Sequence, residues 1–259
     1  MKITHKSIVF LALIVGAWVV PNSVQSQGFE GVVNMIMKIP ALGETKLPIS
    51  ISVKGDKNVA TLDIPMQGQS KIYGDSKKRT MTVVQVAQKT GMEIDQSKLD
   101  EITKANAGSA SPPAKTGKKE LIAGFSAEEY SSLSNGTAEL DLWLAKDLPK
   151  TISDAIRASN EATMRMTQSG SEGFADLFKQ GYTMLRTVVK QAGTAMFIME
   201  FVGIEQKKIA DSEFEIPSDI KIQKVDPTKP PPGAQQNSNS GAQIEPINTP
   251  PPQMEPPKK

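Results

Sequence analysis

The side chains behind most thiol, imidazole and metal chemistry are almost absent from this chain. It has no cysteine, and its only histidine is His5. The best remaining soft-metal donors are Met35 and Met37, whose spacing of two would place both on one face of a strand. Thioethers select Cu(I), but a thioether pair without histidine or cysteine does not complete a copper site. We therefore predict no metal site and no cofactor.

The carboxylates offer little for acid–base catalysis. Glu128 and Glu129 are adjacent, so on a strand they point to opposite faces and do not form a dyad. Glu200 has Ile198 and Val202 as its neighbours at the ±2 positions. It could be a desolvated acid with a raised pKa, or an outward-facing glutamate paired with a lysine. We favour the second interpretation, because a lone carboxylate rarely makes a site.

Nucleophilic catalysis has no better support. One Ser-x-x-Lys pattern occurs, Ser218 to Lys221, but it follows a proline and lies next to a proline-rich tail. The sequence contains neither a G-x-S-x-G nucleophile elbow nor a phosphate-binding P-loop. We predict no catalytic residues, and expect that the protein is not an enzyme.

Residues 1–26 have the organisation of an export signal. Lys2, His5 and Lys6 precede 13 apolar residues at 8–20, and small residues before Gln27 suit a signal peptidase. Thirteen residues are fewer than the roughly 20 that span a bilayer, and no later segment reaches that length without a charge. We therefore expect an exported, soluble protein of the periplasm or the extracellular medium, with no transmembrane segment after cleavage and, lacking cysteine, no lipid anchor.

The charge balance argues against nucleic acid as a partner. Removal of Lys2 and Lys6 with the leader leaves 28 basic residues against 28 acidic ones, interspersed along the chain. A neutral chain has no basic footprint for phosphates, and 5% aromatic residues offer few platforms for base stacking.

The other end of the chain is rich in proline. Residues 226–259 hold ten of the 18 prolines and almost no large apolar side chains. Such a segment cannot bury enough surface to offset its ordering entropy, so we predict a disordered tail. We interpret the tail as a solvated spacer; the alternative is that it binds in a groove of an envelope protein. Residues 27–225 then form a single β-rich domain.

Within this domain the apolar residues alternate with a period of two. The segments 29–39 and 47–53 follow this pattern, and polar turns follow at 54–57 and within 74–79. Asn135-Gly136 favours a type I′ hairpin turn before the alternating strand 138–145, and a last hairpin joins 182–190 to 194–206. Short helices are expected at 95–105, 149–168 and near 174–178, with a loose loop at 106–118. The fold class is α+β: a curved antiparallel sheet, an unclosed half-barrel, wrapped around one or two helices.

Four segments resemble one exported bacterial family. They are FEGVVNMIMKI at 29–39, KELIAGFSAEEY at 119–130, AELDLWLAKDL at 138–148 and DSEFEIPSDIKI at 211–222. The family is domain of unknown function family 4412, which looks related to the periplasmic lipoprotein-carrier (LolA-like) fold. Its members often carry a cysteine in the segment matching Ile122–Tyr130, where this chain has Ser126 and Ala127. The resemblance implies no catalytic residues and a domain whose concave face could shelter acyl chains.

Two functions follow from these observations. The first is a carrier or sensor that binds a lipid-like apolar ligand on the concave sheet, where flexible methionines suit varied ligands. The second is a structural or interaction module of the envelope with a packed core, contacting partners through its outer face or tail. The candidate lining residues of a ligand cavity are Val33, Met35, Met37, Ile51, Leu140, Leu142 and Ile198.

Overall fold

A computed structural model describes residues 29–43, 45–65, 67–98, 111–134, 138–166 and 172–227. The predicted leader, most of the predicted tail and the Asn135-Gly136 turn lie outside these ranges. The described residues form one mostly β unit, and within it no helix is both long and apolar enough to cross a membrane.

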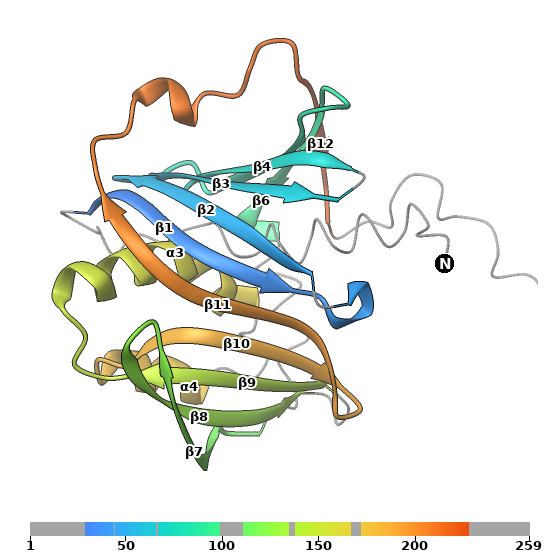
Figure 1. Ribbon diagram of the computed structural model, residues 1–259. Helices are drawn as coiled ribbons and strands as arrows, with labels where there is room; N and C mark the ends of the chain where they lie inside the picture. Colours follow the sequence, from blue (N-terminus) through green and yellow to red (C-terminus); the bar gives the residue numbers. More distant parts are fainter. Residues whose placement is uncertain are drawn as a thin grey trace, which may run out of the picture. The chain divides into compact units, whose positions relative to one another are not determined.

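Twelve strands of the described chain form one sheet that does not close (Figure 1). Its order is β12-β6-β5-β4-β3-β2-β1-β11-β10-β9-β8-β7, and every neighbouring pair is antiparallel except β12 and β6. The predicted fold class, an unclosed antiparallel sheet with few helices, is confirmed. The strands are β1 (Glu30–Lys38), β2 (Lys46–Lys54), β3 (Lys57–Ile64), β4 (Gly68–Asp75), β5 (Thr80–Gln85), β6 (Thr90–Asp95), β7 (Ala114–Ile122), β8 (Phe125–Ser134), β9 (Ala138–Ala145), β10 (Thr183–Gln191), β11 (Thr194–Gln206) and β12 (Lys221–Val225).

The turns explain how short connections join these strands. Ala192 (φ 47°) and Gly193 (φ 76°) both have positive φ, as a two-residue type I′ turn requires, and they join β10 to β11. Ala123 and Gly124 adopt the same pair of conformations between β7 and β8. Both hairpins therefore keep the twist of their strands.

The helices are few and short. They are α3 (Lys150–Met166) and α4 (Glu172–Lys179), with 3₁₀ turns η1 (Pro40–Leu42) and η2 (Asp211–Phe214). Helix α3 contacts β10, β11, β1 and β2, the middle of the sheet, and buries Ala155 and Ile156 there. We call the side that α3 covers the inner face. On β1 and β2 the opposite, outer face is exposed or half-buried at Ser50 and Asn34.

Three expectations about elements need correction. Residues 114–118, expected in a loose loop, belong to the edge strand β7. Strands β6 and β12 were not expected at all, because each is short and only weakly apolar. Of the helix expected at 95–105, Asp95 ends β6 instead; residues 96–98 are helical, and the rest lies outside the described residues.

Candidate functional site

The inner face of the sheet is a continuous apolar surface. Residues in direct register share a face, and Met35 pairs with Ile49 on one side and with Phe201 on the other. Met37 pairs likewise with Leu47 and Met199. The row continues through Thr187 to Leu142, so one apolar face runs from β2 to β9.

Six of the seven predicted lining residues lie together on this inner face. Val33, Met35, Met37, Ile51 and Leu142 are at most 3% exposed, and Leu140 is half-buried against the same core. Ile198 does not join them. It pairs with Lys38 and alternates with Met199, so it lies on the outer face and is half-buried. That these six residues line a cavity remains a prediction.

Helix α3 covers this face mainly with small side chains. Ala155, Ala158 and Ser159 are at most 4% exposed, and the Ser159 hydroxyl donates to the Ile156 carbonyl within the helix. Ile156 is the large apolar residue that is fully buried there, and Ile152 packs beside it. The described part of the helix thus contributes little bulk to a core made mostly by the strands.

An ion-pair cluster occupies the outer face around Arg186 of β10. Its Nε donates to Glu200 Oε2 at 2.6 Å, and its two terminal nitrogens donate to Glu120 of β7 at 2.7 and 2.9 Å. Its guanidinium carbon also lies 5.2 Å from the ring centre of Trp143, a cation–π distance. Glu200 therefore faces outward and is paired, as favoured above, but its partner is an arginine rather than a lysine.

The adjacent carboxylates Glu128 and Glu129 do point to opposite faces. Glu128 pairs with Leu144 and accepts a hydrogen bond from Lys115 at 2.7 Å. Glu129 pairs with Trp143 on the outer face, where Thr116 donates to it at 2.7 Å and Lys118 lies at 2.8 Å. Each carboxylate has its own cation, so this geometry gives no shared proton.

Residues 207–225 form a strap across the outer face of β3 to β5. Phe214, Ile216 and Ile220 of this strap pack on a small cluster of Val59, Tyr73 and Val84. Burial beside Glu213 raises the pKa of Tyr73. Strand β12 then pairs with β6, and four ion pairs join strap and sheet: Asp211–Lys54, Glu213–Lys71, Asp219–Lys89 and Lys224–Glu93.

Acid is expected to loosen this strap. Hydrogen bonds from Lys54 and Lys89 lower the pKa of Asp211 and of Asp219. A carboxylate whose folded-state pKa is depressed contributes above its unfolded value of about 3.9 and loses that contribution as the pH falls through the folded pKa. Hydrogen-exchange protection of residues 209–225, corrected for intrinsic rates, should therefore fall below about pH 4 while β1 and β2 stay protected. Equal pH dependence in wild type and in an Asp211→Asn/Asp219→Asn variant would contradict this.

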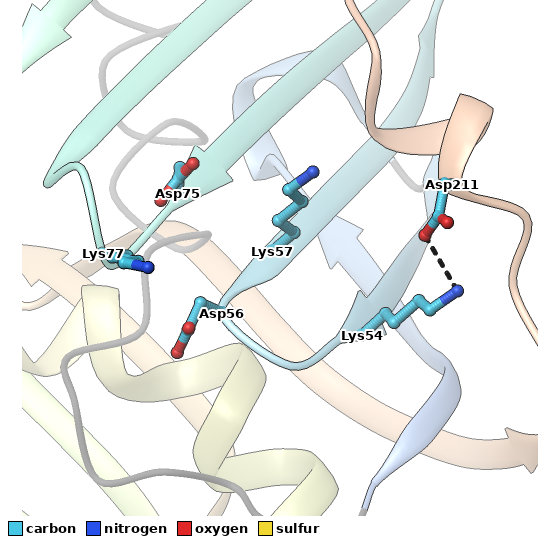
Figure 2. Close-up of a pocket in the computed structure, with 6 residues that line it drawn as sticks. All are labelled: Lys54, Asp56, Lys57, Asp75, Lys77 and Asp211. Carbon is cyan, nitrogen blue, oxygen red and sulfur yellow. Dashed lines mark ion pairs between the residues drawn. The ribbon is translucent and has the colours of Figure 1, made fainter.

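A polar hollow of about 240 Å³ lies where the strap meets the sheet (Figure 2). Lys54 and Asp211 form an ion pair across it at 2.9 Å. The amide of Ser76 donates to the Asp56 carbonyl at 2.9 Å and ties two turns of the rim together. Three lysines and three aspartates balance, so the hollow favours neither an anion nor a cation. The lining residues are Lys54, Asp56, Lys57, Asp75, Lys77 and Asp211.

Ser218 and Lys221, the Ser-x-x-Lys pair, are both exposed within the strap. The Lys221 amide donates to the Lys89 carbonyl at 2.9 Å, at the start of the β12–β6 pairing. The backbone of Lys221 thus attaches the strap to the sheet at the start of β12.

Comparison with known proteins gives the family. A family model described as domain of unknown function (DUF4412) matches residues 29–220, which include eleven of the twelve strands. The chain belongs to this family. The DUF4412 match covers all four segments on which the resemblance was based, apart from the last two residues of 211–222. No curated protein matches the chain.

Solved structures match the DUF4412 chain at low identity. An uncharacterized conserved protein from Thermus thermophilus is 9% identical with a TM-score of 0.46, covering 83% of this chain and 99% of that one. A LolA superfamily protein from Nitrosomonas europaea is 11% identical with a TM-score of 0.29, covering 83% and 99%. A chain of the Pseudomonas aeruginosa MucA/MucB complex is 10% identical with a TM-score of 0.39, and this chain spans 64% of its length.

Sequence reasoning missed three features of the DUF4412 chain. The Arg186 cluster joins residues 66 positions apart, so no local pattern marks it. The strap was treated only as the end of the domain, although its alternating Phe214 and Ile216 are the kind of signal that could have marked a packed segment. The third feature is Asn58, a polar residue between Lys57 and Val59 that is 1% exposed.

Proposed function

We propose that the mature protein is a non-catalytic binding protein of the cell envelope that holds an apolar, lipid-like ligand between the inner face and α3. The observation that carries this proposal is the mismatch between the two surfaces. The sheet side is built from large side chains, among them the flexible Met35 and Met37 and the aromatic Phe201, whereas α3 meets it with Ala155 and Ala158. Over residues 150–159, the part of α3 whose side chains are described, few large side chains hold the helix, so we infer that it can be displaced at modest cost, and methionines adapt to varied apolar partners.

The export signal expected at residues 1–26 supports the location. Acyl chains in an aqueous envelope compartment need an apolar shelter, because each exposed methylene costs about 0.8 kcal/mol. A sheet that is apolar over many strands and covered by a helix could supply that shelter without any catalytic group.

The alternative is an envelope interaction module whose core is simply packed. The complete burial of inner-face residues supports this alternative, because Val33 and Met37 are both 0% exposed. Such a module would contact partners through the outer face or through the tail at 226–259. The two functions differ in one measurable respect, which is whether the core admits a ligand.

Binding of the apolar dye N-phenyl-1-naphthylamine tests the proposal. The purified mature protein should enhance the dye's fluorescence, and a Met35→Gln change on the inner face should weaken binding by about tenfold, because an unpaired amide replaces a thioether of similar length. Ile198→Gln is the matched control: Ile198 lies on the outer face of β11, next to the inner-face residue Met199, and its variant should bind as wild type.

Native mass spectrometry of protein purified from its own envelope gives a second readout. A co-purifying acyl species in wild type and in Ile198→Gln, but not in Met35→Gln, is the expected result. No dye uptake and no bound species in repeated wild-type preparations would overturn the proposal in favour of the packed module.

A further inference from the structure

Asn58 is a polar side chain in an otherwise apolar part of the inner face. It lies on β3 in direct register with Val53 of β2 and Gly74 of β4, and Gly74 pairs in turn with Met81 of β5. Ala60, two residues along β3, lies on the same face. Val53, Asn58 and Met81 are each at most 1% exposed. The amide is therefore out of reach of solvent and has no polar neighbour in register.

Neither amide atom of Asn58 is satisfied. Its Oδ1 and its Nδ2 are buried and have no hydrogen-bond partner in the part of the chain that the structure describes. The buried Tyr130 hydroxyl of β8 is also without a partner among the described residues, but it is a single hydroxyl at the other end of the sheet order. Closer to Asn58, the buried Ser70 hydroxyl of β4 donates to Gln85 at 2.9 Å, and on β9 the buried Asp141 accepts a hydrogen bond from Ser131 at 2.6 Å. Each buried polar group without a partner costs about 1–3 kcal/mol, which an apolar residue of similar size would avoid.

The chemistry of the amide defines what would satisfy it. A carboxamide presents one acceptor and one donor side by side, so its complement is a group that also donates and accepts. A second carboxamide or a neutral carboxylic acid has this form, whereas an ester only accepts. The surroundings of Asn58 also exclude a carboxylate, because an apolar site raises the pKa of a carboxyl group and keeps it protonated. Gly74, directly opposite, places no side chain against the amide.

We propose that Asn58 is the polar anchor of the inner-face ligand, which is an acyl chain ending in a carboxamide or a neutral carboxylic acid. This inference rests on the proposed function. It makes Asn58 a specificity residue: the apolar face binds the chain, and the amide selects the end group.

Displacement of N-phenyl-1-naphthylamine by two neutral competitors with the same acyl chain tests this assignment. Palmitamide can both donate to Asn58 and accept from it, whereas methyl palmitate can only accept. The wild-type protein should bind palmitamide about tenfold more tightly than methyl palmitate. In Asn58→Leu the two competitors should differ by less than about twofold, because neither finds a partner at that position. Asn58→Ala gives the same comparison if the leucine variant does not fold.

Asn34→Leu is the matched control. Asn34 lies on the outer face of β1, where it accepts a hydrogen bond from Ser50 at 3.2 Å, so the same substitution there should preserve the tenfold preference. In urea denaturation without ligand, Asn58→Leu should have a midpoint at or above that of wild type, because it removes an unsatisfied amide.

The outcomes separate this inference from the proposed function. Wild-type protein that takes up the dye but binds the two competitors equally would overturn the role of Asn58 and leave the apolar site standing. A large fall in the urea midpoint of Asn58→Leu would also overturn it, since the amide would then be satisfied within the protein. Failure of the wild type to take up the dye at all would instead overturn the proposed function.

Discussion

Replacing Phe201 with alanine is expected to lower the free energy of unfolding by about 3–5 kcal/mol, the usual cost of removing a buried aromatic ring. Phe201 is 2% exposed on the inner face of β11 and lies in register with Met35 of β1. The ring sits near the middle of the sheet order, so little of the surrounding structure can collapse into the space it leaves. The loss is a large share of the roughly 5–15 kcal/mol that stabilises a typical domain.

Urea denaturation checks this value, with the slope of the transition expected to stay unchanged. Val202→Ala is the matched control, because Val202 is the next residue of the same strand and is 47% exposed. Its effect should be within about 0.5 kcal/mol. A similar loss from both variants would mean that β11 is not divided into inner and outer residues as described.

The same strand shows what could be predicted from the sequence and what could not. The alternation in 29–39 has polar residues on one side only, so it predicts both the strand and its buried face. In β11 the segment AMFIMEFV has apolar residues at both odd and even positions, so its pattern does not distinguish the two faces. A bulge in its pairing with β1, between Asn34 and Met35, also shifts the register. Which face Ile198 occupies is therefore decided by pairing with β1 and not by the pattern of β11 itself.

Long-range contacts set the other limits. Strand β12 is largely exposed, and its position depends on parallel pairing with β6, more than 120 residues earlier in the chain. No local alternation of apolar and polar residues indicates such a long-range pairing. The sequence likewise gives no sign that Asn58 is buried, because an asparagine between a lysine and a valine is typical of the edge of a turn. Its burial follows only from the register that places it between Val53 and Gly74.

Replacing Arg186 with methionine is expected to lower the free energy of unfolding by roughly 2–3 kcal/mol. The side chain of Arg186 is 15% exposed and that of Glu200 is 24% exposed, so the variant leaves a carboxylate without its partner in a poorly solvated place. Breaking a fully buried pair costs about 3–5 kcal/mol, and the partial exposure of Glu200 and Glu120 reduces that figure. Adding Glu200→Gln should restore about 1 kcal/mol, because the uncompensated charge is then gone.

Trp143 reports this change directly, since Trp18 in the predicted leader is the only other tryptophan. Loss of the guanidinium above its ring removes this cation–π contact, so the fluorescence of Trp143 should change. Arg157→Met is the matched control: Arg157 is half-buried on α3, and no ion pair to it is formed by the described residues, so its effect should stay within about 0.5 kcal/mol. Unchanged fluorescence and stability in Arg186→Met would show that the cluster does not hold β7 against β10.

The pH dependence of the Arg186→Met effect separates its charge from its packing. The hydrogen bonds from Arg186 hold the pKa of Glu120 below its ordinary range. A depressed folded-state pKa contributes stability above the unfolded value of about 4.3, and that contribution is lost as the pH falls through the folded pKa. The stability difference between wild type and Arg186→Met should therefore shrink below about pH 4. A difference that stays constant from pH 7 to pH 3 would mean that the packing of the Arg186 side chain, rather than its charge, accounts for the effect.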